Sequence, residues 1–151
     1  MNIEDVVAVM NNEKAAALCL SKGGFEGWLQ AELWCYLTNK GYSVERELKY
    51  PNKDAYCDLV YTPAGAGQLS QWIEVKAYGI FRSGTEARFL DGVANDVMKI
   101  MCDRPGSTNG AVFLIVPNAI GDALNTLIEQ RKWFGFKRHV YELTSIYHLS
   151  D

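Results

Sequence analysis

The chain has 151 residues, of which 48% are hydrophobic and 22% are charged. This length and composition fit one compact globular domain and exclude a disordered tail. The formal net charge of −3 argues against binding nucleic acid through a general basic surplus, so such binding would need a local basic patch, a bound metal or a small contact area.

Cysteines and histidines give no sign of a zinc site or a disulfide framework. The four cysteines lie at positions 19, 35, 57 and 102 without CxxC spacing, so we expect reduced, mostly buried thiols. His139 and His148 have no cysteine or carboxylate at a ligand spacing, and we expect them to be structural or surface residues. The first twenty residues carry four charged side chains and no long apolar run. We therefore expect no secretory signal, no membrane span and a cytoplasmic location.

The first half of the chain predicts two helices followed by three strands. The helices are expected over about residues 2–20 and 25–39, with Lys22-Gly23-Gly24 between them. Strands are expected over about residues 42–50, 55–62 and 69–78, and residues 63–67 fit a hairpin loop between the last two. The first strand would place Tyr42, Val44, Leu48 and Tyr50 on one side at period two.

The second half predicts alternating helices and strands. A helix is expected over residues 86–102, a strand over 111–116, a helix over 120–132 and a closing strand over 137–143. The run at 111–116 is entirely apolar, which is typical of a central strand buried on both faces. It follows a helical crossover and is therefore expected to run parallel to the preceding strand. The chain is thus predicted to be a single α/β domain over residues 1–151 with a mixed sheet.

Charged residues inside the third strand are the informative feature. Alternation places Trp72, Glu74 and Lys76 on one face and Ile73, Val75 and Ala77 on the other. The preceding strand carries one carboxylate, Asp58, among apolar and aromatic neighbours. If the two strands pair as a hairpin, Asp58 lies beside Glu74 on the same face.

Two adjacent, partly buried carboxylates predict a divalent cation. They repel each other, and one would take up a proton unless a cation were bound. Oxygen ligands suit Mg²⁺ or Mn²⁺, which polarises a phosphoryl oxygen and lowers the pKa of bound water. Lys76 would stabilise charge on the phosphate or orient the attacking water. The alternative is that Glu74 and Lys76 form an ion pair on a solvated sheet face.

These residues and their order resemble the PD-(D/E)xK nuclease superfamily, which includes restriction endonucleases and archaeal Holliday-junction resolvases. The resemblance covers about residues 23–117: Glu26 on a helix, the strand at 42–50, Asp58, Glu74-Val75-Lys76, then a helix and a strand. It implies a restriction-endonuclease-like αβββαβ core, within about residues 23–143, with an extra N-terminal helix. It also implies that Asp58, Glu74 and the Val75 carbonyl bind Mg²⁺ or Mn²⁺, with Lys76 near the scissile phosphate. Cys57 replaces the proline of the family name. Asp54, in a turn, is a poorer acidic candidate.

The helix at 25–39 offers two candidates for the family's helical acid. On a helical wheel Glu26 falls inside the apolar sector, whereas Glu32 lies at its opposite edge. A carboxylate in the sheet-facing stripe needs a partner, which a metal site could supply, so Glu26 is preferred. The alternative is that Glu26 simply occupies the first turn, where the helix dipole favours an acid. Gln30 is also expected near the site.

Three further segments could contact a substrate or be structural. Residues 131–138 interleave basic and aromatic side chains, which can bind phosphates and stack on bases or can simply end a helix and enter the core. Asp96 and Lys99 are three residues apart on a helix, and a surface ion pair is expected. The loop at 79–84 directly follows the strand of Glu74 and is a candidate substrate contact.

The leading hypothesis is a metal-dependent nuclease acting on DNA, in repair, restriction or phage-related defence. A second hypothesis is a nuclease-fold module that has lost catalysis and binds a nucleic acid or a protein, which the acidic net charge favours. A third is an unrelated α/β protein in which Glu-x-Lys is coincidental. A homodimer would allow so small a domain to cut both strands of a duplex.

Overall fold

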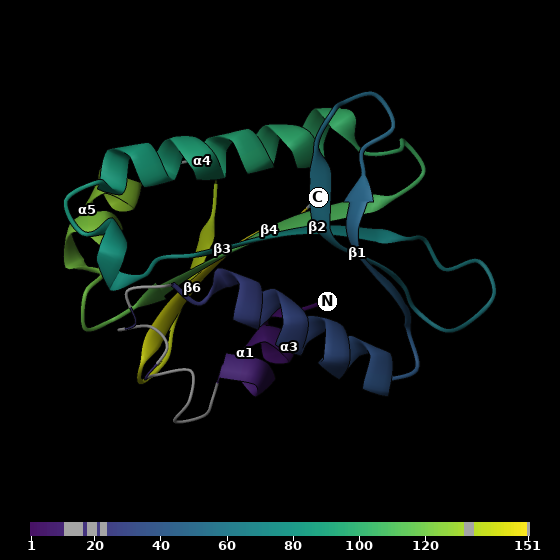
Figure 1. Ribbon diagram of the computed structural model, residues 1–151, viewed down its shortest axis with the longest axis horizontal. Coiled ribbons are helices and arrows are strands. Elements are labelled where there is room, and N and C mark those ends of the chain that lie inside the picture. Colours follow the sequence, from purple (N-terminus) through teal and green to yellow (C-terminus); the bar gives the residue numbers. More distant parts are fainter. Residues whose placement is uncertain (11–16, 18–20, 22–23, 132–134, 151) are drawn as a thin grey trace.

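The computed structural model describes residues 1–10, 17, 21, 24–131 and 135–150. Its strands are β1 (Ser43–Lys49), β2 (Tyr56–Thr62), β3 (Gln71–Ala77), β4 (Asn109–Pro117), β5 (Lys137–Val140) and β6 (Thr144–Ser150). Its α-helices are α1 (Ile3–Met10), α3 (Glu26–Asn39), α4 (Glu86–Met98) and α5 (Asp122–Arg131). The strands form one sheet in the order β1-β2-β3-β4-β6-β5. Helices α1 and α3 cover one face of this sheet, and α4 and α5 cover the other (Figure 1).

The strand pairings confirm the expected mixed α/β architecture. β2 and β3 form the predicted antiparallel hairpin. β4 runs parallel to β3, with Glu74 opposite Val112, as expected for strands joined by a helical crossover. β4 is buried from its second residue to its last, which confirms that the apolar run is a central strand.

Several predicted boundaries change. The first helix is described only over α1, because residues 11–16 and 18–20 of the predicted segment lie outside the described residues. The helix predicted to end at residue 102 leaves the α conformation at Met98 and continues as a π-helical turn, Lys99–Asp103. The closing strand ends at Val140, since the Tyr141 N–H donates to the Thr144 carbonyl in a tight turn. This turn leads into β6, a strand that was not predicted, which pairs with both β4 and β5.

Each face of the sheet has its own hydrophobic core. On the α1/α3 face, Leu29, Leu33 and Leu37 of α3 pack against apolar side chains of β2, β3 and β4. On the α4/α5 face, the apolar stripe of α4 packs against Trp72 and alternate residues of β4. No helix within the described ranges is long and apolar enough to cross a bilayer.

The side chains of the first strand change from one sheet face to the other at one point. Tyr42 and Val44 pack on the α1/α3 face, whereas Leu48 and Tyr50 pack on the α4/α5 face, so the prediction of one common side is wrong. The cause lies at Glu47, whose φ of 54° is left-handed and uncommon for a residue with a side chain. This exchange brings Tyr50 to the face that carries Glu74.

Candidate functional site

The candidate site forms where β2 and β3 separate. Their backbone pairing extends from Tyr61–Gln71 to Leu59–Ile73. After Leu59–Ile73, two β2 side chains replace the β2 backbone as hydrogen-bonding partners of β3. Asp58 Oδ2 accepts a hydrogen bond from the Val75 N–H at 2.8 Å, and Cys57 Sγ lies 3.3 Å from the Ile73 carbonyl oxygen. The separation therefore directs the Asp58 carboxylate toward the middle of β3.

Glu74 is the most buried acid of the site. Its residue exposure is 1%, so the alternative of an ion pair on a solvated sheet face is wrong. Burial, followed by the negative charges of Asp58 and Asp96, raises the pKa of Glu74 to about 8. Burial also raises the pKa of Asp58. Carboxylates placed this closely favour either a proton or a cation.

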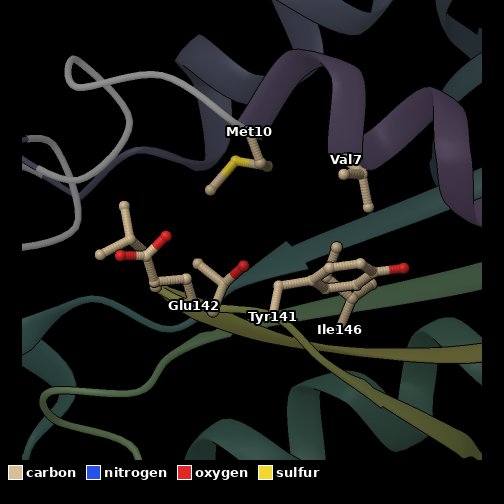
Figure 2. Close-up of a pocket in the computed structure, with 7 residues that line it drawn as sticks. Val7, Met10, Tyr141, Glu142 and Ile146 are labelled. Carbon is tan, nitrogen blue, oxygen red and sulfur yellow. The ribbon is translucent and has the colours of Figure 1, made fainter.

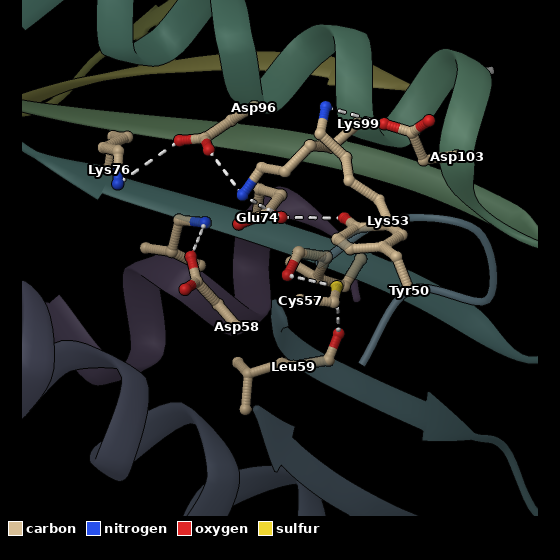
Figure 3. Close-up of polar contacts among 12 residues, drawn as sticks. Tyr50, Lys53, Cys57, Asp58, Leu59, Glu74, Lys76, Asp96, Lys99 and Asp103 are labelled. Atoms are coloured by element: carbon tan, nitrogen blue, oxygen red, sulfur yellow. Dashed lines mark hydrogen bonds and ion pairs between the residues drawn. The ribbon is translucent and has the colours of Figure 1, made fainter. Parts of the chain in front are cut away.

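A buried lysine and a tyrosine hold the inner side of Glu74. The Tyr50 hydroxyl donates to Glu74 Oε1 at 2.7 Å, and Lys99 Nζ lies 2.7 Å from the same oxygen (Figure 3). Lys99 Nζ is also 2.7 Å from Asp96 Oδ1. Burial disfavours the Lys99 ammonium, but Asp96 and Glu74 outweigh this effect and raise its pKa.

The predicted pair of Asp96 and Lys99 exists, but its placement on the surface is wrong. Asp96 is 3% exposed and Lys99 8% exposed. Asp96 comes seven residues after Phe89 and three after Val93, both buried core residues of α4, so it lies in the apolar stripe of the helix. That position was the signal that could have identified it.

Lys76 connects the inner and outer parts of the site. Its Nζ lies 3.3 Å from Asp96 Oδ2 and 3.2 Å from Glu26 Oε1, and Glu26 Oε2 accepts a hydrogen bond from the Ala77 N–H at 3.1 Å. Burial disfavours the Lys76 ammonium, but Asp96, Glu26 and Asp58 outweigh this effect and raise its pKa. The structure thus brings Glu26 into contact with Lys76, whereas Glu32 is exposed.

The charge of this cluster leaves room for a divalent cation. Four carboxylates, those of Glu26, Asp58, Glu74 and Asp96, surround the two ammonium groups of Lys76 and Lys99. When all four carboxylates are ionised, they exceed the two ammonium groups by two negative charges, which one divalent ion would balance. In addition, the buried Asp96 Oδ2 makes no hydrogen bond within the described part of the chain, although Lys76 lies close enough for an ion pair.

The oxygen-rich donor set suits Mg²⁺ or Mn²⁺. Within the described residues, no three side chains of His, Cys, Asp or Glu form a group that could hold a metal ion by themselves. A metal bound by two carboxylates would therefore need a backbone oxygen, such as the Val75 carbonyl, or water to complete its ligands.

Other residues singled out from the sequence add no charge to this cluster. Asp54 is exposed and pairs with Lys49 at 2.9 Å. Burial raises the pKa of the Cys57 thiol to about 12, so this cysteine is structural. His148 stacks on Phe113 with ring centroids 4.5 Å apart, on the opposite sheet face from Glu74. Gln30 is buried in α3.

Of the basic and aromatic segment at 131–138, Arg138 takes no part in the cluster. Residues 132–134 lie outside the described residues. Arg138 on β5 pairs with Glu129 at 2.5 Å and lies over the Tyr147 ring. A separate pocket of about 220 Å³ lies between α1 and the β5–β6 turn, lined by Met10, Tyr141 and Ile146 among others (Figure 2). It does not share a residue with the carboxylate cluster.

No protein-family model, curated protein or solved structure matches this chain. Its function is therefore inferred from the geometry and charge of the site, together with the resemblance of its motif.

Proposed function

We propose that the chain is a metal-dependent nuclease that hydrolyses phosphodiester bonds, with DNA as its substrate, in repair, restriction or phage-related defence. The observation that carries this proposal is the convergence of four residues from three separate elements. Glu26 from α3, Asp58 from β2, and Glu74 and Lys76 from β3 lie in one continuous cluster of ion pairs, hydrogen bonds and charge interactions. Their order along the chain is that of the PD-(D/E)xK pattern.

Asp58, Glu74 and the Val75 carbonyl would hold Mg²⁺ or Mn²⁺. When bound, the metal would supply Lewis-acid polarisation of a phosphoryl oxygen and a more acidic water. Lys76 is held by Asp96 and Glu26 at 3.3 and 3.2 Å and keeps its proton. Its ammonium would stabilise the negative charge that develops on the phosphate. Glu26 therefore acts as a positioning residue, because it fixes Lys76 and the end of β3 together.

One observation favours the second candidate, a nuclease-fold module that binds nucleic acid or protein without cutting. Lys99 already lies 2.7 Å from both Glu74 and Asp96. Its positive charge offsets part of the negative charge that would otherwise attract a metal ion. The two candidates differ in whether a divalent ion binds beside Lys99.

Metal-dependent cleavage distinguishes them. Plasmid and single-stranded DNA would be incubated with Mg²⁺, Mn²⁺ or EDTA and with wild type, Asp58→Asn or the control Asp54→Asn. Asparagine can still accept the Val75 hydrogen bond, so Asp58→Asn removes charge and leaves the strand contact. We expect cutting with metal by wild type and Asp54→Asn alone. Absence of cutting in every metal, together with no heat of Mn²⁺ binding in calorimetry, would overturn the proposal and leave the binding module. The molecular mass of the active protein, measured by analytical ultracentrifugation, would test whether the chain acts as a homodimer.

A further inference from the structure

The loop that leaves β3 is held in a defined shape beside the site. A short 3-10 turn, Ile80–Arg82, begins two residues after Tyr78. The Arg82 N–H donates to the Gly79 carbonyl at 2.9 Å. After the loop, at the start of α4, Glu86 Oε1 accepts hydrogen bonds from the Tyr78 hydroxyl and the Gly84 N–H, both at 2.8 Å. Both ends of the loop are therefore fixed by the same carboxylate, and Phe81 and Arg82 project from it at set positions.

Phe81 lies in a place that two glycines keep open. A Cβ atom on Gly24 would come within 2.7 Å of the Phe81 ring, and one on Gly79 within 2.8 Å. The ring thus lies against backbone from both sides of the site, just before α3 and just after β3. It nevertheless remains 44% exposed. A large aromatic ring held this rigidly, with part of its surface in water, is suited to stacking on a ligand.

Arg82 provides a positive charge at the same point. Its guanidinium lies 4.7 Å from the centroid of the Phe81 ring. Within the described residues, no carboxylate forms an ion pair with it. A guanidinium of this kind is able to bind a phosphate.

Phe81 and Arg82 line a pocket that is continuous with the proposed catalytic cluster. The pocket has a volume of about 370 Å³ and is also lined by Gly24, Glu26 and Ala77. Glu26 contacts Lys76, and its other oxygen accepts the Ala77 N–H. The acid in the pocket wall is therefore already paired with Lys76, which offsets its negative charge toward an anionic ligand.

We propose that Phe81 and Arg82 form a nucleotide subsite, which selects single-stranded nucleic acid at the catalytic cluster; this inference rests on the proposed nuclease function. Phe81 stacks on a base, and Arg82 binds the adjoining phosphate. Bases inside a duplex are already stacked on their neighbours, so the aromatic face is accessible only to an unpaired or terminal nucleotide. The substrate is therefore a single strand, or an unpaired segment of a branched or frayed molecule.

Binding in EDTA tests this subsite without requiring cleavage. Fluorescence anisotropy would compare one short DNA single strand, its duplex and the RNA single strand of the same sequence. The variants are Phe81→Ala, Phe81→Leu and Arg82→Ala. The matched controls are Trp34→Ala on α3, whose residue is 42% exposed, and Arg88→Ala, an exposed arginine on α4. Phe81→Leu keeps an apolar side chain against the glycines and removes the aromatic face, which separates stacking from loss of folding.

We expect both Phe81 variants to weaken single-strand binding by about 5- to 150-fold and to leave duplex binding nearly unchanged. Arg82→Ala would lower the salt dependence of single-strand binding by about 0.7 in log–log slope. The RNA strand shows whether the sugar is also selected. Equal losses on duplex and single strand, affinities within twofold of wild type for both Phe81 variants, or no binding to any nucleic acid would each overturn the inference.

The two proposals fail separately. Metal-dependent cleavage with unaltered binding by the Phe81 variants would remove the subsite and keep the nuclease. Phe81-dependent binding of single strands without cleavage in any metal would keep the subsite and remove the catalytic function.

Discussion

Removing the Lys99 ammonium tests the electrostatics of the site most fully. Lys99→Met keeps most of the apolar stem and deletes the charge that lies 2.7 Å from both Glu74 and Asp96. Breaking a buried ion pair by removing one partner costs about 3–5 kcal/mol, because the other charge is left buried without compensation. Glu74 limits this cost because its pKa of about 8 lets it hold a proton at neutral pH, so the uncompensated charge is mainly that of Asp96. We therefore expect a loss of about 3 kcal/mol in the free energy of unfolding, at the lower end of that range.

A loss of this size is measurable by thermal and chemical denaturation. For a domain of this length it corresponds to a fall in Tm of about 6–12 °C. Lys53→Met is the matched control, because Lys53 forms an ion pair with Asp103 at 3.0 Å but its side chain is 38% exposed. Partly exposed pairs contribute little, so the control should lose at most about 1 kcal/mol.

Added Mn²⁺ separates a metal site from a simple structural pair. If the carboxylates bind a divalent ion, removing the competing ammonium strengthens that binding. At about 100 times its Kd, Mn²⁺ would restore about 2.7 kcal/mol to Lys99→Met. Wild type would gain less at the same concentration. The reasoning is refuted if Lys99→Met is no less stable than Lys53→Met, or if Mn²⁺ raises the Tm of wild type and Lys99→Met equally.

Two further predictions concern Glu74 and Glu26. The pKa of Glu74 is raised in the folded chain from its ordinary 4.5 to about 8, so without metal its contribution to stability is present at low pH and is lost as the pH rises through this interval. Urea denaturation across this range should show the decline in the free energy of unfolding of wild type and a flatter profile in Glu74→Gln. Parallel profiles for the two proteins would contradict the raised pKa of Glu74. Glu26→Gln should change the free energy of unfolding by at most about 1 kcal/mol, since the pair with Lys76 is partly exposed. Glu26→Gln should nevertheless slow metal-dependent cleavage by up to about 100-fold, because Lys76 would be misplaced. The control Glu32→Gln changes an exposed side chain and should leave the rate unchanged. Equal cleavage rates for the two variants would exclude a positioning role for Glu26.

The parts of the site that depend on the alternation of side chains along a strand could be predicted from the sequence. Glu74 and Lys76 share a face because side chains alternate along a strand, and the glycine-containing loop at 63–67 predicts the hairpin that brings Asp58 near them. The strand order of β2, β3 and β4 follows from this hairpin and from the helical crossover. These are local rules, and the structure agrees with them.

The parts that depend on tertiary packing were not predictable in the same way. Tyr50 reaches Glu74 only because the backbone at Glu47 becomes left-handed and exchanges the faces of β1, and no glycine marks that position. Lys99 is buried where α4 passes into a π-helical turn. A carboxylate and a lysine three residues apart have the same sequence pattern whether they face water or a sheet. The sequence does not predict β6, because the expected closing strand at 137–143 runs through the turn that separates β5 from β6.

The most direct test of the central claim is single-turnover DNA cleavage in Mn²⁺ by Lys76→Met beside wild type, with Mn²⁺ affinity measured on the same samples. Because Lys76 is assigned to the phosphate rather than to the metal, the variant should bind Mn²⁺ at least as tightly as wild type and cut DNA at least about 100-fold more slowly. Cleavage by Lys76→Met at the wild-type rate would contradict the account, as would a wild-type protein that binds Mn²⁺ and cuts no DNA.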